Sequence, residues 1–324
     1  MQRIQQGFTL LELLVVITLL ALLATAGLVA YEGIGESAAD TAAANNIKSA
    51  DSAIRTFRAV ENVYPNQWDN LANVDGELAG GAFSVLAETT REFLGQVSLA
   101  TGTAADDAVL ASLSNVGINE LQTLDTLSVI PTGFPPNEFF NESSGAAVPA
   151  DEVEWEFDDV AGVWGAEYDE AAKTAFNISI VPSSAADGTL TSCTLGTKVL
   201  TGTLAGATVA DSTILNRIND HLDSDGCHMV VAVGFGKDVP GTTLGSKVAV
   251  STAPTYSNGN VINPSVDYAR YIALFHVGSD GLDESTPDGS IGAAEILPKA
   301  RLLAVVDTEG RNIDQAIAGA FASN

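Results

Sequence analysis

A continuous helical pattern begins near the start of the chain and runs to about Val60. Its first half is apolar and its second half is amphipathic. Phe8 to Tyr31 is an apolar run whose only charge is Glu12, and it is long enough to span a membrane as a helix. No proline occurs before Val60, so the pattern predicts a helix of about 50 residues and about 75 Å. In the second half, apolar residues at steps of three and four fall on one stripe, formed by Ala43, Ile47, Ala50, Ile54 and Phe57.

The charges of the second half support this helix. Asp51 stands four residues before Arg55, the favourable order for a helical ion pair. Tyr64-Pro65 ends the helix, because the residue before a proline is pushed out of the α region. We expect the stripe to pack on a globular head, and the apolar half, Phe8–Tyr31, to stay bare, that is, without contact to that head.

Residues 61–150 are predicted to form a helical and loop insertion. Apolar residues at helical spacing predict helices at Ala82–Val97 and Ala104–Leu113, with a third piece at Glu120–Leu127. Pro131–Ala150 is rich in Pro, Gly, Ser and Asn and is predicted to be a loop.

Residues 151–324 are predicted to form a β-rich head. The alternation of apolar and acidic residues from Val153 to Phe157 indicates a strand with one wet face. Helices are expected at Ser212–Leu222 and Asn312–Phe321. The fold class is therefore α+β, with the long helix packed on an antiparallel sheet. Further strands are expected at Phe176–Val181, Lys198–Thr203, His228–Phe235, Lys247–Thr252, Arg270–Val277 and Arg301–Asp307.

Glu12 is costly in an apolar segment. An acidic residue at mid-membrane costs about 2.5–3.5 kcal/mol, and less near the end of the span. It could simply reach the interface. No Lys or Arg lies between Arg3 and Lys48, so a cationic partner must come from elsewhere. Cleavage after Gly7 would create a new α-amino group that a neighbouring subunit could present to Glu12.

The residues around that cut resemble the prepilin signature of type IV pilins and type II secretion pseudopilins. The match is Gly7-Phe8-Thr9-Leu10-Leu11-Glu12 followed by an apolar run, and it extends from the leader to about Val60. The resemblance implies that a membrane peptidase cuts after Gly7 and methylates Phe8. It also implies that Glu12 meets the Phe8 amine of the adjacent subunit during filament assembly.

One position departs from the family pattern. Many members have a proline at the place that Val29 holds in this chain, and there the helix bends or melts. Any local melting would have to come from nearby glycines, each of which weakens a helix by about 1 kcal/mol. These are Gly27, Gly33 and Gly35.

A second interpretation of the N-terminus is an ordinary secretory signal. Arg3, the apolar core and Ala24-Thr25-Ala26 form such a signal with an A-x-A site. The mature protein would then start at Gly27 as a secreted soluble enzyme or binding domain. Glu12 inside the apolar core argues against it.

Composition and motifs argue against a nucleic-acid-binding protein and against an enzyme. The net charge is −27, and −28 without a leader that contains Arg3, so no nucleic-acid partner is expected. The sequence has no G-x-S-x-G, H-E-x-x-H or phosphate-loop motif, and we expect no enzyme. Cys193 and Cys227 are predicted to form one disulfide in an exported head, with two buried free thiols as the alternative.

An acidic loop follows the strand predicted at Arg270–Val277. It places four carboxylates close together, and calcium prefers such oxygen ligands on a flexible loop. The loop is similar to the calcium loop of major pseudopilins, to which the head bears a loose likeness. A solvated acidic loop is the alternative. The expected ligands are Asp280, Asp283 and Asp288, with Glu284 and Ser279 as further candidates.

The sequence therefore predicts a structural pilin-like subunit. It divides into a leader (1–7), a long helix (8–60, with 8–31 in the membrane), an insertion (61–150) and a head (151–324). Its expected partners are copies of itself, other pilins, the prepilin peptidase and an inner-membrane assembly platform. The precursor is expected to be a single-pass inner-membrane protein, and the product a periplasmic or extracellular filament.

Overall fold

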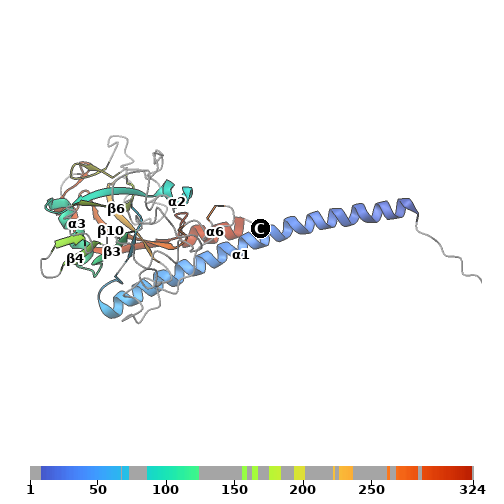
Figure 1. Ribbon diagram of the computed structural model, residues 1–324, viewed down its shortest axis with the longest axis horizontal. Coiled ribbons are helices and arrows are strands. Elements are labelled where there is room, and N and C mark those ends of the chain that lie inside the picture. Colours follow the sequence, from blue (N-terminus) through green and yellow to red (C-terminus); the bar gives the residue numbers. More distant parts are fainter. Residues whose placement is uncertain are drawn as a thin grey trace, which may run out of the picture.

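The computed structural model describes residues 9–66, 68–72, 86–123, 155–158, 163–166, 175–183, 193–200, 222, 226–235, 261–262, 268–283 and 287–322. Within these ranges the protein is α+β, with one long helix and a head built around a mixed sheet (Figure 1). The helices are α1 (Leu10–Glu61), α2 (Glu88–Phe93), α3 (Ala104–Ser114), the 3-10 helix η5 (Ala293–Glu295) and α6 (Ile313–Ala322). The strands are β1 (Trp68–Asn70), β2 (Gly95–Ala100), β3 (Glu120–Thr123), β4 (Trp155–Asp158), β5 (Val163–Ala166), β6 (Ala175–Val181), β7 (Thr194–Leu195), β8 (Lys198–Val199), β9 (His228–Phe235), β10 (Tyr271–Ser279), β11 (Ser290–Ile291) and β12 (Ile296–Val306).

Helix α1 is continuous over 52 residues, which corresponds to about 78 Å. Its N-terminal half projects away from the head (Figure 1). The helix passes through Gly27, Gly33 and Gly35 without interruption, so the glycines cause no break in it. It ends at Glu61 and is capped by Asn62. The φ of Asn62 is 62°, a left-handed conformation that asparagine tolerates better than most residues, and its N–H donates to the Arg58 carbonyl.

The second half of α1 packs on the head as its apolar stripe predicts. Ala43, Ile47, Ala50, Ile54 and Phe57 are all buried. The predicted ion pair is also present, with 2.8 Å between Arg55 Nε and Asp51 Oδ2. This half of the helix is therefore part of the core, and it fixes the direction in which the bare half leaves the head.

Tyr64 anchors the exit of α1. Its N–H donates to the Val116 carbonyl at 2.6 Å, and its hydroxyl accepts from the Leu302 N–H at 2.9 Å. Its ring meets Phe275 edge-on, with 4.9 Å between centroids. Tyr64 thus joins the end of α1 to the turn after α3 and to two strands of the sheet.

Among the described residues the main sheet has nine strands, in the order β12-β10-β9-β1-β3-β4-β5, with β6 also paired to β9 and β2 paired to β6. All its pairs are antiparallel except β1 with β3. A second, small sheet has the order β11-β7-β8. Residues 61–150 therefore contribute β1, β2 and β3 to the sheet, in addition to helices.

Of the three helices predicted in residues 61–150, the prediction at Ala82–Val97 is wrong in part, and the prediction at Glu120–Leu127 is wrong over its described residues. In the described part of Ala82–Val97 the structure has a helix only over α2, and β2 begins at Gly95 with alternating burial. Residues 120–123 of the piece predicted at Glu120–Leu127 form β3. Pairing with neighbouring strands overrides the local helical spacing in both segments. The helix predicted at Ala104–Leu113 is confirmed as α3.

Most strands predicted in the second half are confirmed. The alternating segment near Val153 contains β4, and the other matches are β6, β9, β10 and β12. Only Lys198–Val199 of the strand predicted at Lys198–Thr203 is described as a strand, and the last predicted helix is α6. The predictions that lie outside the described residues are the loop at Pro131–Ala150, the strand at Lys247–Thr252 and all of the helix at Ser212–Leu222 except Leu222.

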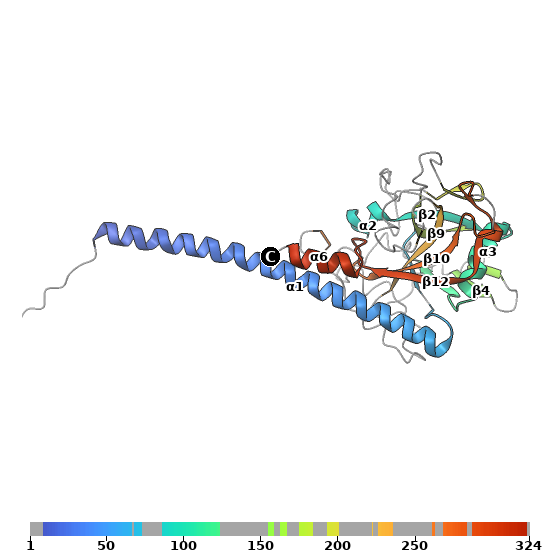
Figure 2. The ribbon, with the colours of Figure 1, turned by 180° about the vertical axis from the view of Figure 1, so that it is seen from behind.

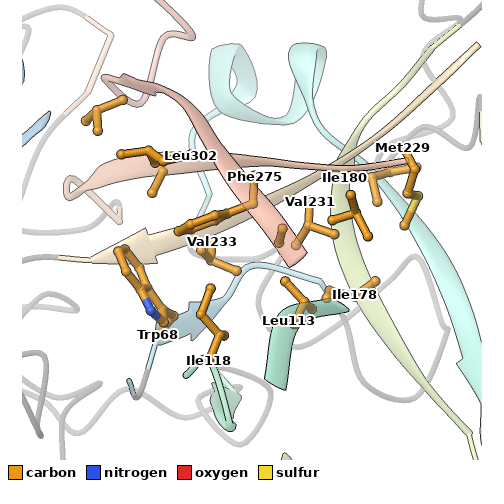
Figure 3. Packing of buried hydrophobic residues seen from close by; sticks show 14 of the residues in the cluster. Trp68, Leu113, Ile118, Ile178, Ile180, Met229, Val231, Val233, Phe275 and Leu302 are labelled. Carbon is orange, nitrogen blue, oxygen red and sulfur yellow. The ribbon is translucent and has the colours of Figure 1, made fainter. Parts of the chain in front are cut away.

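The core lies on both faces of β9, all eight residues of which are buried. Val231 and Val233 belong to the cluster that contains the α1 stripe and α3, whereas Val230 and Ala232 face the cluster of α2. Trp68 is fully buried in the first cluster, near Val233 and Ile118 (Figure 3), and its ring centroid lies 5.5 Å from those of Phe235 and Phe275. Because both faces are covered, the strand is apolar along most of its length.

Strand β12 lies at one end of the strand order, but side chains from two helical segments occupy its outer edge. Asn115 donates to the Pro298 carbonyl at 3.0 Å, and Arg55 donates to the Leu303 carbonyl at 3.4 Å. Arg58 reaches the Ala300 carbonyl at 3.5 Å. Groups that could pair with another strand are thereby satisfied within the chain, which protects this edge from strand addition.

A buried ion pair links β1 to the segment before β10. Arg270 Nη1 lies 3.0 Å from Asp69 Oδ2, both side chains are 1% exposed, and the Tyr268 hydroxyl donates to the same oxygen. Burial raises the pKa of Asp69, and the charge of Arg270 and the hydrogen bond from Tyr268 oppose this rise. The carboxylate therefore depends on its partners to remain charged inside the core.

We expect Arg270→Met to lower the free energy of unfolding by about 3–5 kcal/mol, because it leaves a carboxylate buried without its cation. Denaturant melts of the detergent-solubilised chain, followed by tryptophan fluorescence, measure the change. The double variant Asp69→Asn/Arg270→Met should recover part of the loss. Unchanged stability of Arg270→Met would contradict this account.

Candidate functional site

Glu12 is held at the start of α1 by a capping box with Thr9. Glu12 Oε2 accepts from the Thr9 N–H at 2.9 Å and from the Thr9 hydroxyl at 3.0 Å. In return the Thr9 hydroxyl accepts from the Glu12 N–H at 3.3 Å. The carboxylate therefore has a polar partner within its own chain, and this partner is neutral and not a cation. The spacing Thr-x-x-Glu before an apolar run is the signal that could have revealed it.

The capping box leaves part of the carboxylate open. Both hydrogen bonds from Thr9 go to Oε2, and no group among the described residues donates to Oε1. A carboxylate can accept about four hydrogen bonds. Glu12 can therefore serve as a helix cap and accept a further donor from outside the chain at the same time.

The segment from Leu10 to Leu28 is apolar and entirely exposed. It has a mean hydropathy of 2.4, none of it is buried, and it is the one helix among the described residues that is long and apolar enough to cross a membrane. Its few hydroxyls are satisfied by its own backbone. Thr18 donates to the Val15 carbonyl at 2.9 Å, and Thr25 donates to the Ala21 carbonyl at 3.0 Å. Such internal bonding suits a helix in lipid.

Comparison with protein families places this segment in a known class. Residues 2–28 match the family model described as the prokaryotic N-terminal methylation motif. The chain thus carries a prepilin-type signal of the type IV pilin and pseudopilin kind, which marks a pilin-like protein processed by prepilin peptidase and anchored in the membrane as a precursor. No curated protein and no solved structure matches the chain. Gly7 and Phe8 lie within the matched range and outside the described residues.

The two cysteines form a disulfide. Cys193 and Cys227 are joined with their Cα atoms 5.4 Å apart, and both residues are fully buried. Cys193 directly precedes β7 and Cys227 directly precedes β9, so the bond connects the small sheet to the main sheet. This pairing agrees with an oxidising compartment for the head.

The carboxylates of the loop after β10 bind mainly the loop itself. Asp280 accepts from the Gly289 N–H at 2.7 Å and from the Asp288 N–H at 3.2 Å. Asp288 accepts from the Ser290 N–H at 2.8 Å. Glu295, which the sequence pattern did not single out, accepts from the Gly281 N–H at 2.6 Å. These bonds hold the described parts of the loop against each other and against η5.

The expected calcium ligands are not brought together as a set. Among the residues that the structure describes, no three acidic, histidine or cysteine side chains form a group that could hold a metal ion. Asp283 is exposed, Ser279 is buried at the end of β10, and Glu284 lies outside the described residues. Calcium binding at Asp280, Asp283 and Asp288 stays a prediction.

Two histidines on neighbouring strands meet near this loop. The rings of His228 on β9 and His276 on β10 are 5.5 Å apart. Burial lowers the pKa of His276 to about 4, and the nearby charges of His228 and Arg301 act in the same direction. Folded protein therefore keeps His276 neutral at pH values where the unfolded chain is protonated.

We expect stability to fall as the pH falls from about 6.5 to about 4, because the unfolded state binds a proton that the folded state refuses. The slope due to this group is at most about 1.4 kcal/mol per pH unit. His276→Gln should flatten that part of the profile relative to its own stability at pH 8, in denaturant melts across the range. Parallel profiles of the two proteins would remove His276 from this role.

Proposed function

We propose that this chain is a pilin-like subunit that is cut after Gly7, methylated at Phe8 and polymerised into a filament of the type IV pilus or type II secretion pseudopilus kind. The observation that carries the proposal is the bare half of α1. Twelve large aliphatic side chains between Leu10 and Leu28 are each at least 44% exposed. Burying each one is worth about 1.5–3 kcal/mol. Lipid covers them in the precursor, and copies of the same helix cover them in a filament.

Glu12 supports assembly into a filament because its Oε1, which receives no hydrogen bond from the described residues, can bind a cation. The amine of a newly cut Phe8 on a neighbouring copy is such a group, and its charge offsets the cost of burying the carboxylate among apolar helices. The capping box holds the carboxylate at the first turn of α1. Glu12 would thereby set the axial position of one subunit relative to the next.

The acidic head fits a structural role better than the alternatives. A net charge of −27 disfavours a nucleic-acid partner, and the methylation motif is typical of structural subunits. A soluble secreted domain that starts at Gly27 is not favoured, because the motif spans residues 2–28 and α1 passes through Ala24–Gly27 without a break. The proposed partners are the prepilin peptidase, an inner-membrane assembly platform and other pilins.

Mass spectrometry of the mature protein tests the processing step. We expect an N-terminus at Phe8 that carries one extra methyl group. A Gly7→Val variant should remain uncut in the membrane, because its side chain blocks the position that the peptidase accepts as glycine. A mature protein that begins at Gly27 would refute the proposal in favour of an ordinary signal peptide.

Three variants separate the charge of Glu12 from its capping role. Glu12→Gln keeps a side chain that can cap Thr9 and loses the charge, whereas Thr9→Ala loses the cap and keeps the charge. We expect Glu12→Gln and Glu12→Ala to insert in the membrane and form no filaments. Thr9→Ala should assemble, with a loss of about 1 kcal/mol in helix stability.

Electron microscopy of sheared filaments and membrane fractionation provide the two measurements. Normal filaments from Glu12→Gln would show that the negative charge is not needed. Loss of filaments in Thr9→Ala alone would assign the role to the cap instead.

A further inference from the structure

A groove runs between α1 and α6 just beyond the exposed span. Figure 2 shows α6 lying along α1 on the side of the head from which the bare half departs. The groove has a volume of about 410 Å³. From α1 it is lined by Ser37, Thr41, Ala44, Asn45 and Lys48, and from α6 by Ile313, Ile317, Ala320 and Phe321.

Polar contacts fix the two walls of the groove. Arg311, just before α6, donates to Asp307 at 2.9 Å and to Asp40 of α1 at 3.0 Å. The Ser37 hydroxyl donates to the Ala320 carbonyl at 2.9 Å. A Cβ at Gly319 would lie 2.8 Å from Asp40 Oδ2, so the glycine permits this close approach. The groove is therefore preformed, and a partner does not have to order it.

The two walls of the groove differ in chemistry: the α6 wall is apolar, and the α1 wall is small and polar. On α6, Ile317 and Phe321 stand four residues apart on one stripe and are 41% and 76% exposed. The α1 wall is made of small and polar residues, with Lys48 among them. Small side chains let another helix approach closely, and the exposed apolar pair would cover its flank.

We propose that this groove receives the Leu10–Leu28 segment of another copy of this chain. The proposal rests on the filament function proposed above. A filament that grows along α1 requires copies displaced from each other along that axis. Leu28 lies nine residues before Ser37, so a copy displaced by about 14 Å already brings its apolar segment level with the groove. Displacements up to about 57 Å, which align Leu10 with Lys48, keep it there.

Lipid is the other apolar occupant, and the geometry disfavours it. The headgroup region extends about 5–8 Å beyond each side of the hydrocarbon layer. The groove begins about 14 Å beyond Leu28 along the helix, which places it outside that region when the span is in the membrane. Phe321 and Ile317 would then stay in water until a second copy arrives.

Site-specific photo-crosslinking in filaments of the full chain tests the proposal. A benzophenone amino acid replaces Phe321, and in a second variant Ile317, while the matched control carries it at Ala318. Ala318 is exposed on the same helix and does not line the groove. After irradiation we expect covalent dimers from positions 321 and 317, mapped by mass spectrometry to Leu10–Leu28 of the other copy, and none with that attachment from position 318.

The outcomes separate this inference from the function on which it rests. Unmodified chain that is processed but forms no filaments would overturn both. Filaments in which positions 321 and 317 crosslink to lipid, to other parts of a neighbouring head or to nothing would overturn the groove alone. The Ile317 variant decides the matter if the bulkier group at position 321 prevents assembly.

Discussion

The apolar half of α1 cannot remain in water, and the arrangement of the whole molecule follows from this constraint. None of the segment from Leu10 to Leu28 is buried against its own head, so its burial must come from lipid or from other chains. The same helix continues without a break from this exposed segment into the core of the head, where Ile47 and Ile54 are buried. The span and the head are therefore joined by one continuous helix.

Several contacts of the head hold the second half of α1 in place. Tyr64 ties the helix exit to the turn after α3 and to the sheet, and Arg311 ties the start of α6 to Asp40 of α1. The Cys193–Cys227 bond and the Asp69–Arg270 pair stabilise the interior of the head. These contacts are spread over both halves of the sequence, so the head and the second half of α1 form a single structural unit.

The sequence predicted local helical patterns well and long-range strand pairing poorly. The α1 stripe, the Asp51–Arg55 pair and α3 were predictable because a helix is specified by residues within a few turns. Strands β2 and β3 were not, since their conformation comes from β6, β1 and β4, which lie at a distance in the sequence. At the functional segment Glu12 was predictable from its cost. Its bond to the neutral Thr9 follows from the Thr-x-x-Glu spacing and not from charge, and the groove depends on α6 reaching α1 from the other end of the chain.

The occupied edge of β12 has a consequence for how subunits are stored. Precursors held in one membrane are confined to two dimensions, where their heads collide far more often than in free solution. Asn115, Arg55 and Arg58 disfavour a strand-to-strand contact between heads at the β12 edge, which would be extensive and slow to reverse. At this edge, contact between heads is thereby left to side-chain packing, which forms and separates without breaking a backbone ladder. Under the proposed function, a store of such subunits in the membrane can therefore be used and replenished.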